Sequence, residues 1–298
     1  MNKITVILTA LIAIWLVSFG TVKILEKSNS IENKIVIIPI KGVIVPDETD
    51  MFLFGEETTS SDNLIKKLDN AEKDQRIKAI IFEIDSPGGT VVASKEIANR
   101  VNKLKKPSVS WIRESGASGA YWVASASDYI VADELSVTGS IGVTSSYLEF
   151  SKLFEKYGVG YERLVSGDYK DVGTPYKKLS KNEKELLQKK LDLIHQMFIE
   201  DVASNRNITV EKLDKFANGI FYLGREAYDI GLVDKLGNKD DAVNKAKELA
   251  KIKEAKIIEA TEKKSVIDIL SKLLNNAFFY AGRGIGSSMA YGGLRINA

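Results

Sequence analysis

Short apolar runs alternate with stretches of helical periodicity between residues 35 and 132. The nearly continuous apolar run at 77–84 is typical of a strand that is covered on both faces. Apolar residues at 64, 65, 68 and 71 recur at the spacing of one helix face. The full pattern predicts strands at 35–40, 77–84, 108–112 and 129–132, and helices at 63–74, 92–104 and 120–127. This alternation predicts an α/β fold with a mostly parallel sheet.

From Ser180 onward the pattern is mainly helical. Ser180 and Glu183 have the spacing of a capping box, and apolar positions follow on one face of a long helix. His195 lies inside this helix, and we interpret it as a core or groove histidine. Shorter helices are predicted at 210–217, 224–230 and 240–250, and the glycine- and serine-rich stretch 282–293 predicts a flexible tail.

The N-terminus carries 19 uncharged residues, Ile4 to Val22, between Lys3 and Lys23. As a helix this run would span ~28 Å, close to the ~30 Å hydrocarbon core of a bilayer. It is longer than the apolar region of a cleaved signal peptide, about 7–15 residues, and no A-x-A-like site follows it. The sequence therefore predicts an uncleaved transmembrane anchor at 1–25 and a linker at 26–34. A single large domain at 35–255 and a C-terminal extension at 256–298 follow.

Residues 45–60 are predicted to form a loop, although Met51, Phe52, Leu53 and Phe54 are unusually apolar for one. Two interpretations remain open. The loop could pack onto the body of the domain, or it could contact lipid or an apolar peptide.

Composition excludes several classes of chemistry. Lys and Arg number 42 and Asp and Glu 40, so the net charge of +2 gives no strong field to attract nucleic acid. The chain has no cysteine, which removes disulfides, thiolate nucleophiles and cysteine-ligated zinc. The chain has a single histidine, so if it is a hydrolase, a histidine can serve as its general base at only one position, His195.

Two glycine-containing turns follow predicted strands. In the first, Ser86-Pro87-Gly88-Gly89, two glycines can expose backbone N–H groups that bind a phosphate or an oxyanion, or can simply form a tight turn. In the second, Ser118 falls on the first turn of a predicted helix. This placement is similar to a nucleophile elbow, although the G-x-S-x-G spacing is not met, and a helix N-cap is the structural alternative.

Five motifs in the same order resemble the signal peptide peptidase A family. They are Ser86–Gly89, Ala117–Trp122, Thr138–Val143, Ser166–Asp171, and Gly224–Ala227 with Gly231–Asp234. The resemblance extends from about residue 35 to 250. It implies a membrane-anchored serine protease with the Clp-protease/crotonase-like fold, an α/β fold built from repeated β-β-α units. It also implies a single protease unit in the chain.

The resemblance implies a role for each site residue. Ser118 is the expected nucleophile, Lys170 the general base, and Ser140 the hydroxyl that orients the lysine amine. The expected oxyanion hole consists of backbone N–H groups of Gly88 or Gly89 and of Gly119.

A lysine base is consistent with the composition. A free lysine has a pKa near 10.4, and burial can lower such a pKa by ~3–5 units. A nearby carboxylate would oppose this change, so Asp168 and Asp171 must point away from the amine.

The expected function is that of a membrane-bound serine endopeptidase that degrades cleaved signal peptides and other short apolar peptides. No metal or organic cofactor and no nucleic-acid partner is expected. By resemblance the protein forms a ring-shaped homo-oligomer and spans the cell membrane once, with the catalytic domain on the extracytoplasmic side. The alternatives are a crotonase-like acyl-CoA-binding enzyme and a stomatin-partner-type membrane protease with a different protein substrate.

Overall fold

The computed structural model describes Ile12, Trp15 and residues 33–47 and 57–260. The domain expected at 35–255 falls mostly within these ranges. The other anchor residues, Met51–Phe54 and the stretch from 261 onward lie outside them, so the predictions for these segments remain predictions. In the part of the chain that is described, no helix is both long and apolar enough to cross a bilayer.

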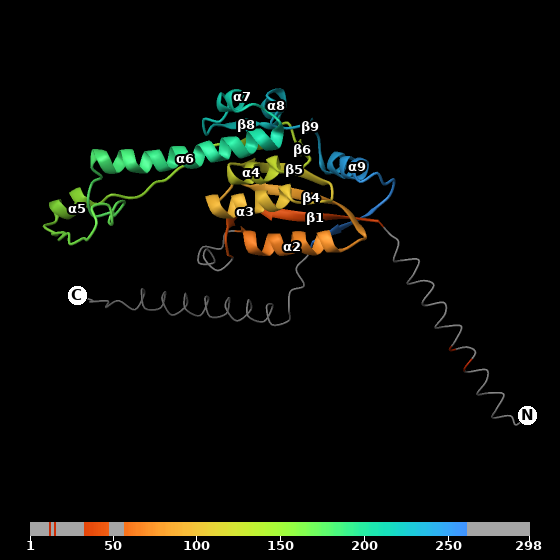
Figure 1. The fold of residues 1–298 in the computed structure, drawn as a ribbon, viewed down its shortest axis with the longest axis horizontal. Coiled ribbons are helices and arrows are strands. Elements are labelled where there is room, and N and C mark those ends of the chain that lie inside the picture. Colours follow the sequence, from red (N-terminus) through yellow and green to blue (C-terminus); the bar gives the residue numbers. More distant parts are fainter. Residues whose placement is uncertain (1–11, 13–14, 16–32, 48–56, 261–298) are drawn as a thin grey trace, which may run out of the picture. The chain divides into compact units, whose positions relative to one another are not determined.

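A β-sheet of eight strands, counted over the described residues, forms the centre of the domain (Figure 1). Its main path runs β10-β1-β4-β5-β6-β9, and all neighbours on this path are parallel. β7 adds parallel to the far end of β5, and β8 is antiparallel to β7. The strands are β1 (Lys34–Lys41), β4 (Ile77–Ser86), β5 (Ser108–Ala117), β6 (Tyr129–Ala132), β7 (Val137–Gly139), β8 (Phe221–Leu223), β9 (Lys235–Leu236) and β10 (Lys256–Glu259). This confirms the predicted α/β architecture.

Helices cover both faces of the sheet. α9 packs on one face against β1, β4, β5 and β6, whereas α2 and α4 contact the other face and α3 lies between them. The C-terminal half of α6 packs on α4. The helices are α2 (Ser61–Lys73), α3 (Val91–Asn102), α4 (Gly119–Ser125), α5 (Ser151–Lys156), α6 (Lys181–Arg206), α7 (Val210–Asp214), α8 (Gly224–Asp229) and α9 (Lys239–Leu249).

Successive side chains of a strand point to opposite faces of the sheet, and in β1 and β4 most of the buried side chains on both faces are apolar. Ile35 and Ile37 of β1 and Ile81 of β4 pack with Ala242 and Ala246 of α9. The intervening residues of each strand point to the opposite face, toward α2 and α4. Full burial of such a side chain contributes roughly 1.5–3 kcal/mol, so strand pairing and helix packing stabilise one another.

Several elements differ from those that the sequence predicted, and the first of these differences bears on the site. β5 continues five residues beyond the predicted end at 112 and stops at Ala117, directly before Ser118. The segment predicted as a loop at 45–60 contains a short strand, β3 (Thr58–Ser60), which pairs in parallel with β2 (Val43–Val45). Thr and Ser have no apolar period, so only pairing with β2 specifies that strand. β10 also adds to the sheet beyond residue 255 by pairing with β1.

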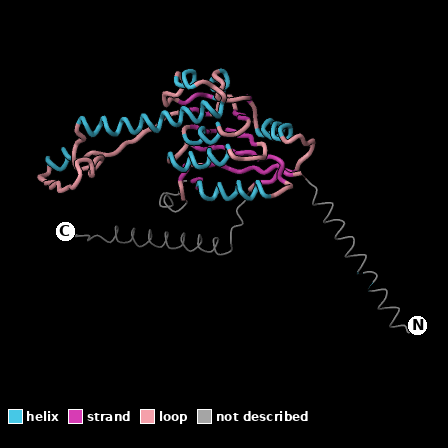
Figure 2. The backbone as a smooth tube through the Cα atoms, in the orientation of Figure 1, coloured by secondary structure: helices cyan, strands magenta, loops and turns pink. Residues whose placement is uncertain are grey.

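Residues 145–180, here called the arm, lie between β7 and α6 and contain α5. Figure 1 places α5 beside the N-terminal end of α6, away from the sheet, and Figure 2 shows that most of the arm is loop. The arm packs on itself: the ring of Phe154 stacks on Tyr176 at 5.7 Å, and Phe150 N–H donates to Pro175 O at 2.8 Å. Nearly all of its side chains remain exposed or half-buried.

Candidate active site

Ser118 occupies a strained turn between β5 and α4. Its φ of 53° and ψ of −124° are rare for a residue with a side chain. The turn is held by Ser118 N–H, which donates to Gly139 O at 2.8 Å, and by Ser118 O, which accepts from Trp122 N–H at 3.0 Å. The Ser118 hydroxyl makes no capping bond to the helix. Ser118 therefore stands at the N-cap position of α4 without using its hydroxyl as a cap, and the backbone forms a sharp elbow between strand and helix.

The Gly88-Gly89 turn lies against this elbow. Gly88 has a φ of 102°, and a Cβ there would come within 2.8 Å of Gly119 N and 2.9 Å of Ala117 O. A Cβ on Gly89 would come within 2.0 Å of Ile44 O. Only glycine permits both approaches. This close packing brings the two glycine-containing turns together.

The hydrogen bonds distinguish the two glycines. Gly88 N–H already donates to Ser86 Oγ at 3.1 Å. Within the described residues, the N–H groups of Gly89 and Gly119 donate to no protein acceptor. A Cβ on Gly119 would lie 3.3 Å from Gly89 N, so these two unpaired donors lie on the same side of the elbow.

Ser140 follows β7 as Ser118 follows β5. Gly139 is paired with Ala117 in the ladder, which places the two serines at the adjacent ends of neighbouring strands. Ser140 also has a positive φ, 50°, and its hydroxyl donates to Gly219 O at 3.1 Å. With its proton engaged, the Ser140 oxygen is available to accept a hydrogen bond.

Lys170 lies elsewhere, in an exposed turn of the arm that is closed by its own N–H to Gly167 O at 3.1 Å. Across the described ranges, no hydrogen bond joins it to Ser118 or Ser140, and it does not line the pocket beside Ser118. The structure therefore brings Ser118, Ser140 and the glycines together in one chain but does not bring Lys170 to them.

The carboxylate of Asp171, next to Lys170 in the sequence, is bound by other residues of the arm. Asp171 accepts two hydrogen bonds from Arg163, at 2.8 and 2.9 Å, and forms an ion pair with Lys177 at 3.4 Å. The hydrogen bonds from Arg163, with a further contribution from Lys177, lower the pKa of Asp171 to about 2. This charge is therefore compensated within the arm.

A pocket of about 100 Å³ opens beside Ser118. Its lining includes Gly89 and Gly119, residues 142–144, and the aromatic side chains of Trp122 and Phe198. Sequence reasoning did not assign a function to either aromatic residue. Trp122 belongs to the ASGAYW motif, but Phe198 lies about eighty residues later and carries no local signal.

His195 has a structural contact that its sequence position did not reveal. Its Nε2–H donates to Ile141 O at 3.2 Å, which links α6 to the segment that runs along the pocket. This agrees with the interpretation of a groove histidine.

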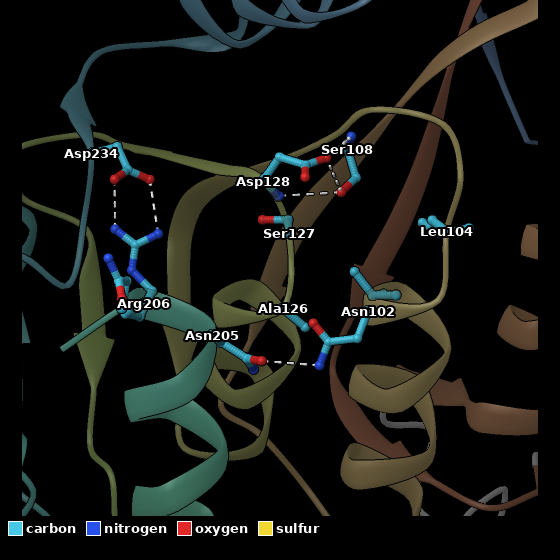
Figure 3. Close-up of a pocket in the computed structure, with 11 residues that line it drawn as sticks. Asn102, Leu104, Ser108, Ala126, Ser127, Asp128, Asn205, Arg206 and Asp234 are labelled. Carbon is cyan, nitrogen blue, oxygen red and sulfur yellow. Dashed lines mark hydrogen bonds and ion pairs between the residues drawn. The ribbon is translucent and has the colours of Figure 1, made fainter. Parts of the chain in front are cut away.

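A larger, polar pocket of about 430 Å³ lies at the N-terminal ends of the strands, where β5, β6 and β9 begin (Figure 3). Figure 3 shows that several of its side chains bind one another. Arg206 holds Asp234 through two bonds of 2.9 and 2.6 Å, and Ser108 Oγ donates to Asp128 at 3.1 Å. No predicted site residue lines it, and these contacts connect α6 to the strands.

Over the described ranges, no group of three or more His, Asp or Glu side chains is arranged to hold a metal ion.

Comparison with known proteins identifies the family. The model of peptidase family S49 matches residues 100–253, just over half of the chain, and the model of Clp protease matches residues 43–130. A Methanocaldococcus jannaschii protein named as a protease is 35% identical over 82% of this chain and 78% of its own. The chain belongs to peptidase family S49.

Two other relatives carry more specific names. An Enterococcus faecium protein named as a signal peptide peptidase is 34% identical over 84% of this chain and 74% of its own. The chloroplastic serine protease SPPA of Arabidopsis thaliana is 34% identical over 71% of this chain and 32% of its own. The resemblance drawn from the motifs is confirmed. This S49 protein is a serine protease of a Ser/Lys-dyad family with the Clp-protease/crotonase-like fold, and the acyl-CoA-binding alternative is wrong.

Proposed function

We propose that this S49 protease is a membrane-bound endopeptidase that degrades cleaved signal peptides and other short apolar peptides, with Ser118 as its nucleophile. The observation that carries the proposal is the strained elbow at Ser118 beside two unpaired backbone N–H groups. Strain of this kind persists where surrounding structure enforces it, commonly at catalytic residues.

In the proposed reaction, Ser118 Oγ attacks the carbonyl carbon of the scissile peptide bond and its proton passes to a neutral lysine amine. The carbonyl oxygen becomes an oxyanion that accepts hydrogen bonds from Gly89 N–H and Gly119 N–H. We assign Gly89 rather than Gly88 because Gly88 N–H already donates to Ser86. The protonated lysine then donates its proton to the leaving amine, and water hydrolyses the acyl-enzyme by the same route.

Lys170 is the proposed base, and we infer that a neighbouring subunit supplies it. In its own chain Lys170 lies on the arm, apart from Ser118. The arm exposes many large apolar side chains, with Leu164 95% exposed, which favours burial against another subunit. These side chains are Tyr147, Leu148, Leu153, Tyr157, Val159, Tyr161, Leu164, Val165, Tyr169 and Tyr176. Contact of this head-to-tail kind generates a ring when its rotation closes.

Ser140 is the proposed partner of that amine. Its hydroxyl donates to Gly219 O, so its oxygen can accept an N–H from the lysine while the amine lone pair faces Ser118. A hydroxyl holds a neutral amine without adding a charge that would favour protonation.

The substrate class follows from the pocket and from the predicted anchor. An extended peptide can bind as an added strand beside the Gly88-Gly89 turn, with its side chains in small pockets. An anchor at 1–25 would hold the enzyme at the membrane, where cleaved signal peptides are released. The catalytic domain in this proposal lies on the extracytoplasmic side.

Subunit complementation tests the nucleophile and the base together. Ser118→Ala and Lys170→Ala are each expected to be inactive toward an apolar reporter peptide. After the two variants are dissociated and reassembled at equal amounts, activity is expected to return to about a quarter of wild type, because about one site in four then combines an intact Ser118 with an intact Lys170 from its neighbour.

Differently tagged subunits, recovered together, serve as the control for exchange. Recovery of mixed rings without activity would assign the dyad to a single chain. Wild-type activity in Ser118→Ala would overturn the nucleophile assignment itself.

A further inference from the structure

Positive charge gathers at the end of the sheet where β10, β1, β4 and β5 begin. Because these four neighbouring strands are parallel, the segments that lead into them lie side by side. These segments, here called the basic edge, are 33–34, 73–78, 103–108 and 250–256. They contain ten Lys or Arg and two Asp or Glu, a net charge of +8, whereas the whole chain has +2. The charge of this protein is therefore strongly asymmetric.

The four segments of the basic edge are bonded to one another. Lys34 pairs with Lys256 in the ladder between β1 and β10. Lys34 N–H also donates to Arg76 O at 2.8 Å, and Lys106 Nζ donates to Asp74 O at 2.7 Å. The charges therefore form one continuous surface rather than four separate loops.

Most lysines of the basic edge are available to a ligand. Asp74 accepts two side-chain hydrogen bonds from Arg76, at 3.0 and 2.8 Å, and these bonds lower the pKa of Asp74 to about 2. This acidic charge is thus compensated by its neighbour. Exposed lysines whose amino groups form no hydrogen bond or ion pair within the described ranges are Lys73, Lys78, Lys103, Lys105, Lys251 and Lys253.

The excess of positive charge stops at β5. Farther along the same end of the sheet, before β6 and β9, lie Asp128 and Asp234, whose carboxylates bind Ser108 and Arg206 (Figure 3). Only one half of this end of the sheet is basic. Contact with a flat anionic surface would therefore fix the tilt of the domain as well as its distance.

The path of the chain favours a membrane as that surface. The predicted anchor ends at residue 25, and the chain enters β1 between β10 and β4, in the middle of the basic edge. Residues 26–32 can span at most about 25 Å, so an inserted anchor keeps the basic edge near the lipid headgroups. The four segments contain no aromatic residue, on which the bases of a single-stranded nucleic acid would stack.

We propose that the basic edge binds the headgroups of anionic lipids and thereby orients the catalytic domain on the membrane. Each Lys or Arg that reaches an anionic lipid surface strengthens binding about fivefold. β5 begins at this edge and ends at Ala117, so Ser118 is held about 30 Å from the headgroups, at the other end of the strand. This inference rests on the proposed function, because it assumes that the anchor brings the domain to a membrane.

The test uses the full-length chain with one introduced cysteine, since the natural sequence has none. Gln75→Cys reports on the basic edge, and Leu135→Cys, at a side chain 71% exposed just after β6, reports on the opposite end of the sheet. Each variant carries a fluorophore and is reconstituted into vesicles with nitroxide-labelled headgroups. The vesicles are made of phosphatidylcholine alone or of phosphatidylcholine mixed with phosphatidylglycerol.

Quenching of the Gln75→Cys probe is expected to be about twofold or more stronger in the anionic vesicles than in the neutral ones. About 0.5 M salt should remove this difference, because it shortens the screening length to about 4 Å. The Leu135→Cys probe should be quenched equally in both kinds of vesicle.

Charge removal tests whether the lysines of the basic edge are responsible. The test variant replaces four exposed lysines of the edge: Lys103→Gln, Lys105→Gln, Lys251→Gln and Lys253→Gln. The matched control replaces four exposed lysines of α6: Lys181→Gln, Lys184→Gln, Lys189→Gln and Lys190→Gln. Both lose the same total charge, but only the first is expected to lose the lipid-dependent quenching. Both should cleave a soluble reporter peptide in detergent as wild type does.

Each remaining outcome decides a separate claim. Equal quenching of Gln75→Cys in neutral and anionic vesicles would overturn the inference, as would an equal loss in the α6 variant. A chain that does not float with neutral vesicles would contradict the anchor. Salt-sensitive flotation with anionic vesicles would then still support the basic edge, and no flotation with either would overturn it.

Two further results separate the partner and the function. Tighter binding of a duplex oligonucleotide than of anionic vesicles at the same salt concentration would assign the basic edge to nucleic acid and overturn the lipid proposal. Lipid-dependent quenching in a chain without peptidase activity would support the basic edge and contradict the proposed function alone.

Discussion

At the scale of single residues, the backbone of Ser118 links its proposed catalytic role to the stability of the domain. A non-glycine residue at a φ of 53° and a ψ of −124° carries a strain of about 1–3 kcal/mol, because its Cβ crowds the neighbouring peptide groups. The strain is offset by the bond from Ser118 N–H to Gly139 O and by the packing of Gly88 against the turn. These contacts hold the backbone of Ser118, and so its Cβ, in one position.

This strain predicts a difference between two inactive variants. Ser118→Gly is expected to be more stable than Ser118→Ala by about 1 kcal/mol, because glycine adopts a positive φ without a Cβ clash. The free energies of unfolding from denaturant titration measure this difference. Ser115, within β5, is the control: there the glycine variant should be less stable than the alanine variant. A more stable alanine variant at position 118 would show that the turn is not strained.

At the scale of elements, α6 connects the pocket to the far edge of the sheet. Phe198 lines the Ser118 pocket, and Arg206 at the end of the same helix binds Asp234 just before β9. The side chain of Arg206 is 8% exposed and that of Asp234 is 27% exposed. Burial acts to lower the pKa of Arg206, but the hydrogen bonds to Asp234 and the charges nearby outweigh it and leave this pKa raised. The pair therefore fixes the position of α6 on the sheet.

Loss of this ion pair is expected to destabilise the domain. Arg206→Ala should lower the free energy of unfolding by about 3 kcal/mol, since it leaves a partly buried carboxylate without its partner. Arg225→Ala removes an exposed pair with Glu134 of similar length, 2.9 Å, and should cost less than about 1 kcal/mol. Chemical denaturation of both variants provides the comparison. Equal effects would mean that the Arg206–Asp234 pair does not anchor α6.

At the scale of the whole molecule, the proposed function assigns location to the predicted anchor and chemistry to the domain built on the sheet. β1 begins at Lys34, and the two strands that pair with it, β4 and β10, both come from later in the chain. Deletion of residues 1–25 is therefore expected to give an enzyme that remains in the supernatant without detergent and cleaves a soluble reporter peptide with a kcat/KM within about twofold of wild type. Ultracentrifugation and a peptide assay test this. A deletion variant that folds but has lost activity would give the segment a role in the site or its assembly.

The sequence by itself determined the fold class, the order of the main elements and the family. Strands such as 77–84 and helices such as 63–74 could be predicted directly, because burial of one face imposes a local period of two or 3.6 residues. The glycine-containing turns were also visible, since backbone that approaches as closely as Gly88 does to Gly119 tolerates no side chain. Composition narrowed the possible nucleophiles and bases, because the chain has no cysteine and a single histidine.

Tertiary structure decided what depends on contacts between distant segments. The short strands β3 and β7 have no period of their own and exist because β2 and β5 pair with them. Only packing showed that Gly88 N–H is occupied while Gly89 N–H is unpaired, because backbone donors leave no mark in a sequence. Phe198 reaches the pocket across eighty residues of chain, and Lys170 lies apart from Ser118 on an arm that packs on itself. Local patterns in the sequence indicate which side chains are buried. The contacts that each side chain makes depend on how distant segments of the chain pack together.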